Sequence, residues 1–168
     1  NLTLNADIDV NGGDFDGGFV ELDAGGDILV NKSILANSIS GEGFGGDIAI
    51  FAGRDITVAG IVNIEADGHR SADNFCGEAG PIELDADRDL TIGAEVTLHS
   101  NGPSPDCAGE GVFLTAGGNA SVAGHIESRG LGADGGGGSI DLAAGAAVDF
   151  LDTATLDVSG GSAGSGSI

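Results

Sequence analysis

The stretch Gly46 to Gly60, GDIAIFAGRDITVAG, decides the fold because apolar residues occupy every second position in two short segments. These positions are Ile48, Ile50 and Ala52, followed by Ile56 and Val58. A glycine turn separates the two segments. Strict alternation over so few residues is typical of half-buried β-strands and not of helices.

The same pattern returns along the chain with a period of roughly 30 residues. It recurs over residues 18–30, 80–92, 111–122 and 138–150. In every copy the first segment ends its apolar positions on alanine, at Ala24, Ala52, Ala86, Ala116 and Ala144. A position that is always small beside branched neighbours predicts a tight interior corner.

A third, weaker strand is expected to complete each repeat. Its first apolar residues are Ile8, Ile39, Ile64, Leu98, Ile126 and Leu156. In the second repeat we assign this strand to Ile39 and Gly41, so that Asn31 to Ser38 becomes an insertion. Polar stretches of variable length then lead to the next repeat, at residues 14–18, 42–46, 69–80, 103–111 and 131–138. Insertions confined to fixed corners around a constant core are typical of solenoids.

Three short strands per repeat predict an all-β fold, a parallel β-helix (β-solenoid) of roughly five to six coils of about 30 residues. Residues 1–168 would form one domain, uncapped at both ends, because the pattern starts at a second strand and stops where a first strand opens. A helical fold is excluded because each of the 33 glycines would cost a helix ~1 kcal/mol. A β-sandwich would not repeat in register.

The strongly acidic composition argues against two classes of binding partner. The formal charge is −22 and the only lysine is Lys32, so nucleic acid and anionic membrane surfaces, which need clustered Lys and Arg, are not expected partners. No apolar run has the length that membrane insertion requires.

The two cysteines test the register of the coils. Cys76 lies four residues before Gly80, and Cys107 lies four before Gly111. Equivalent positions in stacked coils are ~4.8 Å apart, which is within the Cα separation of a disulfide. We therefore predict a Cys76–Cys107 bridge, and with it an oxidising, extracellular compartment.

Three phrases resemble the repeats of filamentous-haemagglutinin-like surface proteins and related glycine-rich secreted β-helix proteins of bacteria. They are GGDIAIFAGRDITVAG (45–60), AGGDILV (24–30) and GGGGSIDLAAG (135–145). The resemblance covers essentially the whole chain. It implies secretion, a long right-handed β-helical stalk, and roles in adhesion, biofilm or surface fibres.

Asp27, Asp55 and Asp89 occupy the same turn position in three successive repeats. Like charges stacked ~4.8 Å apart repel one another. Arg54 and Arg88, each preceding an aspartate, could compensate. A Ca²⁺ ion held by the three carboxylates is the second possibility, and hydrogen bonds from the turn backbone are the third.

The sequence does not predict an enzyme. Paired carboxylates for acid–base chemistry would arise by chance in so acidic a chain, and no repeat carries a distinctive cluster of His, Arg and acids. His99 falls between Glu65 and Glu127 in an outward column, which favours a surface pair. Phe51 and Phe113 also point outward, either as an apolar stripe or under a covering loop.

We therefore expect the non-catalytic shaft of a bacterial surface adhesin or extracellular filament, secreted or at the cell surface. The alternative is a carbohydrate-binding or carbohydrate-cleaving β-helix domain. No cofactor is required, although Ca²⁺ is possible. The expected partners are other copies of the chain, by end-to-end or lateral packing, and host or matrix glycans.

Overall fold

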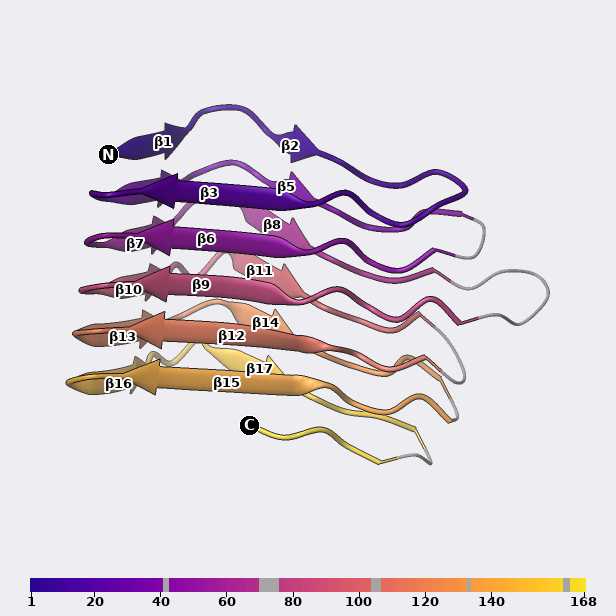
Figure 1. Cartoon of the computed structure of the whole chain (residues 1–168). Coiled ribbons are helices and arrows are strands. Elements are labelled where there is room, and N and C mark those ends of the chain that lie inside the picture. The colour runs from indigo at the N-terminus through magenta and orange to yellow at the C-terminus, as the bar shows by residue number, and fades with distance from the viewer. Residues whose placement is uncertain (41–42, 70–75, 104–106, 133, 162–163) are drawn as a thin grey trace.

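The computed structural model is a stack of coils, and every regular element among its described residues is a β-strand (Figure 1). The structure describes residues 1–40, 43–69, 76–103, 107–132, 134–161 and 164–168. The strands form three parallel sheets, so the predicted β-solenoid is confirmed. No helix in these ranges is long and apolar enough to cross a membrane.

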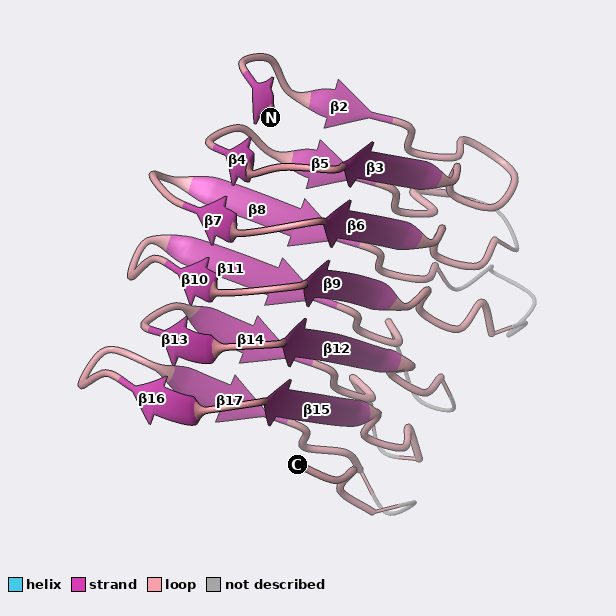
Figure 2. Ribbon diagram, turned by 60° about the vertical axis from the view of Figure 1, so that its left-hand side comes forward, coloured by secondary structure: helices cyan, strands magenta, loops and turns pink. Residues whose placement is uncertain are grey.

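Each complete coil contributes one strand to each sheet, and Figure 2 shows the three sheets running along the stack. The first sheet holds β3 (Val20–Ala24), β6 (Ile48–Ala52), β9 (Ile82–Ala86), β12 (Gly111–Ala116) and β15 (Ser139–Ala144). The second holds β1 (Leu2–Leu4), β4 (Ile28–Val30), β7 (Ile56–Val58), β10 (Leu90–Ile92), β13 (Asn119–Val122) and β16 (Ala147–Phe150). The third holds β2 (Ile8–Asp9), β5 (Ile34–Leu35), β8 (Val62–Glu65), β11 (Val96–His99), β14 (His125–Glu127) and β17 (Thr155–Asp157).

The interior is a set of apolar columns along the axis. In the first sheet Ile48 pairs with Ile82, and Leu84 lies between Ile50 and Leu114. All five side chains are buried. The alanine column is in register through all five strands, which confirms the predicted tight corner. Because the alternation has period two, the intervening side chains face outward.

The third strand of the second repeat differs from the prediction. Ile34, and not Ile39, pairs with Ile8 and Ile64. Ile34 is fully buried whereas Ile39 is 59% exposed, and Gly41 lies outside the described residues. Residues 31–38 are therefore no insertion. The burial of Ile34 between Ile8 and Ile64 shows that this residue occupies the apolar column.

Beyond the third sheet the two sides of each coil converge into a flat arm, which extends to the right in Figure 1. A glycine N–H before the first-sheet strand donates to a carbonyl after the third-sheet strand and closes the triangular body. Gly46 N donates to Ala36 O at 2.6 Å, and Gly80 N donates to Ala66 O at 2.7 Å. The described residues of the polar stretches lie in this arm, outside the three sheets, so variation in the length of these stretches leaves the core unchanged.

The closure requires glycine because the backbones approach so closely. A Cβ atom on Gly17 would lie 1.9 Å from Ala36 O, and one on Gly45 would lie 2.0 Å from Ala66 O. Both contacts are with backbone atoms that hydrogen bonds hold in place. The high glycine content is therefore explained in part by the geometry of the arm.

Replacement of Leu84 by alanine should destabilise the fold strongly. The side chain is fully buried in the central coils, so the loss is expected to be ~2–5 kcal/mol. Glu83→Ala on the outer face of β9 is the matched control and should change stability by less than ~0.5 kcal/mol. Urea unfolding followed by circular dichroism measures both. Equal effects of the two variants would contradict the assignment of inner and outer faces.

Candidate functional site

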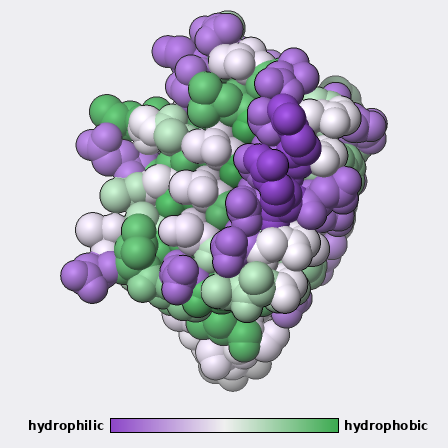
Figure 3. All heavy atoms as spheres, turned by 90° about the vertical axis from the view of Figure 1, so that its left-hand side faces the viewer, coloured by the Kyte–Doolittle hydropathy of each residue, from purple (hydrophilic) through white to green (hydrophobic). Residues whose placement is uncertain are grey.

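The predicted aspartate column lies at the corner between the first and second sheets. Asp27, Asp55 and Asp89 directly precede β4, β7 and β10. The backbone pairing of these strands keeps the three residues in successive coils at one position. Figure 3 views this side of the molecule, where a band of hydrophilic residues runs along the stack.

Arginines neutralise two of the three aspartates, each from the following coil. Arg54 Nη2 donates to Asp27 Oδ2 at 2.7 Å, and Arg88 Nε donates to Asp55 Oδ1 at 2.6 Å. Each arginine thus pairs with the aspartate of the coil before it and not with its own neighbour in sequence. The hydrogen bond from Arg88 is the main reason why the pKa of Asp55 lies below its ordinary value.

The third aspartate uses a different partner. Asn119 donates to Asp89 Oδ1 from its backbone N at 2.8 Å and from Nδ2 at 3.1 Å. The described part of the chain contains no group of three or more His, Cys, Asp or Glu residues arranged to hold a metal ion. Calcium binding at Asp27, Asp55 and Asp89 stays a prediction.

A second polar ladder follows the third sheet, and the sequence analysis missed it. Each side-chain oxygen accepts a hydrogen bond from the backbone N–H of the next coil. Asn11 accepts from Asn37 at 2.7 Å, Asn37 from Asp67 at 2.7 Å, Asp67 from Asn101 at 2.7 Å, and Asn101 from Arg129 at 2.9 Å. The signal was an Asn or Asp three residues after the inward-facing Ile or Leu in the first four strands of the third sheet, and the misassigned Ile39 concealed it.

Asp67 is the one carboxylate among the asparagines of this ladder. Burial raises the pKa of Asp67, and the nearby carboxylates of Glu65 and Glu127 raise it further. The N–H of Asn101 and the charge of His99 act in the opposite direction. Asp67 occupies a position that asparagine holds in the neighbouring coils, and its ionised form is disfavoured there.

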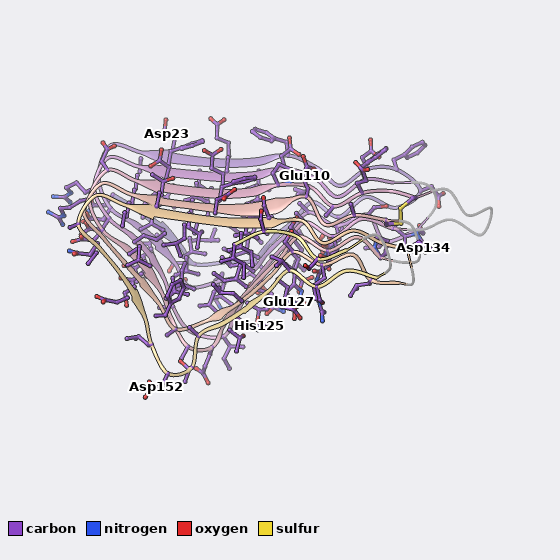
Figure 4. All side chains as sticks on the ribbon, turned by 90° about the horizontal axis from the view of Figure 1, so that it is seen from below. Asp23, Glu110, His125, Glu127, Asp134 and Asp152 are labelled. Carbon is purple, nitrogen blue, oxygen red and sulfur yellow. A yellow bond between two sulfur atoms is a disulfide. The ribbon has the colours of Figure 1, made fainter. Side chains whose placement is uncertain are left out.

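The third sheet also carries a charged cluster centred on Glu127, which is only 7% exposed. Arg129 Nη2 lies 2.6 Å from Glu127 Oε2, and Asn101 Nδ2 donates to the same oxygen at 3.1 Å. His125 Nε2 contacts Oε1. His99 Nε2 lies 3.8 Å from Oε2. Figure 4 shows His125 and Glu127 together on one side of the triangular body.

This arrangement holds the Glu127 carboxylate in its ionised form. Burial raises the pKa of Glu127, but the hydrogen bonds from His125 and Asn101 and the charge of Arg129 outweigh it, so that the pKa lies below its ordinary value. His125 reaches the hydroxyl of Thr155 through its other ring nitrogen. A carboxylate with so many partners joins coils together and has little capacity left for proton transfer.

The structure places His99 between Glu65 and Glu127 along the axis, as the sequence predicted. Its backbone pairs with Glu65 on one side and Glu127 on the other. The sequence did not indicate Arg129 or Asn101 as partners of Glu127, because they come from the neighbouring column two residues later. The register of the strands does not predict which side chains of neighbouring columns contact each other.

The disulfide Cys76–Cys107 is present, as predicted, with a Cα–Cα distance of 5.3 Å. The strands do not place the two cysteines at equivalent positions, however. Val112 pairs with Ile82, so Cys76 lies one residue farther from its strand than Cys107 does. The extra residue after Cys76 lies in the arm, where a difference in length does not alter the three sheets.

On the outer face of the first sheet, acidic and uncharged residues alternate along the axis as the sequence indicated. One column reads Glu21, Ala49, Glu83, Phe113 and Asp141. The next column places Phe51 between Asp23 and Asp85. Both phenylalanines are partly exposed. The alternation separates like charges by two coils, about 9–10 Å.

Comparison with known proteins yields no match to a family model, a curated protein or a solved structure. The fold is therefore established by the geometry of the coils alone.

Removal of the disulfide should lower stability substantially. The bond has a sequence separation of 31 residues, and a closed loop of this size contributes about 3–4 kcal/mol through the entropy of the unfolded chain. The double variant Cys76→Ser, Cys107→Ser should therefore melt earlier than the oxidised wild type. Reduction should lower the wild-type Tm to that of the variant and leave the variant unchanged. An unchanged wild-type Tm after verified reduction would contradict this expectation.

The variant Asp67→Asn should raise Tm at pH 7. The raised pKa of Asp67 means that ionisation costs folding free energy at any pH above the folded-state value. This cost disappears as the pH falls through the folded-state pKa, so the gain in Tm should shrink towards pH 3. Thermal melts across this range measure it, with the exposed outer-face variant Asp141→Asn as control. A gain that does not depend on pH would contradict the assigned cause.

Proposed function

We propose that the chain serves as a structural and adhesive shaft of an extracellular or cell-surface filament, without catalytic activity. The observation that carries this proposal is the continuity of the three sheets. Each runs in one unbroken order along the stack, with parallel pairing throughout. In such an architecture every coil adds ~4.8 Å of length with no new type of contact.

The stabilising devices support the same role. Buried apolar columns, two polar ladders and a disulfide all join one coil to the next. Few of them are specific to a single coil, as a catalytic site would be. The disulfide also favours an oxidising compartment, consistent with secretion or display at the surface.

The proposed partner in a filament is another copy of the chain. In the final coil the inward-facing residue Phe150 is 50% exposed, whereas its equivalent Val122 is buried. A further coil on β16, whether of a longer chain or of another copy, would cover this apolar surface and complete the backbone pairing. Glycans of a host or matrix are proposed as ligands of the side faces.

Electron microscopy of the purified chain tests the proposal. We expect filaments or rods whose diffraction shows the ~4.8 Å spacing of stacked coils. The variant Phe150→Ser should shorten the filaments, whereas Asp149→Ser, its outward-facing neighbour on β16, should not. Monomeric particles that stay unassembled at high concentration, for wild type and both variants, would contradict self-assembly.

A further inference from the structure

Phenylalanine is placed mainly on the outside of this protein. The interior columns of the complete coils consist of isoleucine, leucine, valine and alanine. In contrast, Phe15 is 80% exposed, Phe19 62% and Phe44 40%. Exposed aromatic side chains that gather in one region indicate a contact surface, because leaving them in water forgoes the free energy of burial.

Phe19 and Phe44 line the same hollow, where the first sheet meets the arm. Its volume is about 290 Å³, and Gly17, Gly45 and Gly46 form part of its lining. Phe19 directly precedes β3, whereas Phe44 belongs to the arm of the next coil. A hollow of this size is smaller than most drug-sized pockets. It is suited to one side chain or one small ring.

Two carboxylates line the hollow, and two more lie near one of them. Asp16 and Asp47 are part of the lining, and Asp16 Oδ1 accepts a hydrogen bond from Phe44 N at 2.9 Å. Burial raises the pKa of Glu110, with the negative charges of Asp47 and Glu78 adding to the effect. Asp47, Glu78 and Glu110 therefore form one electrostatic group beside Asp16, and Figure 4 shows Glu110 on the outer side of the first sheet.

Among the residues that the structure describes, no Lys, Arg or His forms an ion pair with Asp16, Asp47, Glu78 or Glu110. The ion pairs in the described ranges involve other acids, at the aspartate column and around Glu127. These acids thus differ from the aspartate column, where arginines from neighbouring coils neutralise the charge. A cationic ligand would lower the repulsion among these acids.

The chemistry of the hollow selects a cation that only donates hydrogen bonds. Ionised carboxylates accept and do not donate, and aromatic faces attract cations. Lysine and arginine side chains carry donors, no acceptors and a positive charge. A neutral sugar also brings acceptors, for which the lining side chains Asp16, Asp47, Phe19 and Phe44 offer no polar donor.

We propose that this hollow binds a lysine or arginine side chain of a basic segment of another protein. The cation would lie between Phe19 and Phe44 and pair with Asp16 and Asp47. Further basic residues of the segment would reach Glu78 and Glu110 along the axis. This binding does not depend on whether the chain assembles into filaments.

A fluorescein-labelled penta-arginine peptide is the probe, titrated against the monomeric protein at about 150 mM salt to screen long-range attraction. Fluorescence anisotropy gives the affinity. The variant Asp16→Asn, Asp47→Asn should weaken binding about five- to tenfold, and Phe19→Ala about two- to fivefold. The control Asp149→Asn, Asp152→Asn removes the same charge at a distant place, since Asp152 lies at the opposite corner of the body in Figure 4. It should weaken binding less than twofold. Unchanged melting curves verify that each variant is folded.

Equal weakening by the control variant would overturn the proposal, because binding would then follow net charge alone. Retention of full affinity by Phe19→Ala would overturn the aromatic contribution and with it the site. A glucosamine oligomer is the competing probe. If it binds in a Phe19-dependent manner while penta-arginine does not, the ligand is an amino sugar and the proposed protein partner is wrong.

Discussion

The backbone hydrogen bonds between consecutive coils are the constraint on which the rest of the structure depends. They run along the axis in parallel register, so each residue has its equivalents directly above and below. A side chain is therefore packed mainly against copies of its own position. Branched apolar residues tolerate this well, because they interlock in columns. The alanine column is small for the same reason, since five side chains in register must all fit one narrow corner.

The same register is unfavourable for charge, because it places like residues about 4.8 Å apart. The chain uses a different solution in each column. In the aspartate column, arginines reach back by one coil. In the ladder after the third sheet, asparagine replaces most of the acids, and its oxygen accepts an N–H from the next coil. On the outer face of the first sheet, uncharged residues separate the acids. Within the described ranges, the acids around Phe19 and Phe44 form no ion pair.

The fold was predictable because the period-two pattern and the roughly 30-residue repeat act together. The bridge between Cys76 and Cys107 was predicted from the same repeat, although the strand register offsets the two cysteines by one residue. The error at Ile39 arose where two isoleucines competed for one column, and only burial distinguished Ile34 from it. The repeat pattern could not predict the clusters at Glu127 and at Phe19. They depend on side chains from different columns, and on an arm whose residues follow no fixed period.

The disulfide also determines how the chain would carry a mechanical load. When a protein is pulled from its two ends, tension follows the shortest covalent path. Here that path leaves the backbone at Cys76 and returns to it at Cys107. The intervening segment includes β9, β10 and β11, and it bears no tension as long as the bond is intact. Roughly 100 Å of extended chain is thereby kept in reserve. The central coil is thus protected from being peeled away, and a reducing agent would release its length.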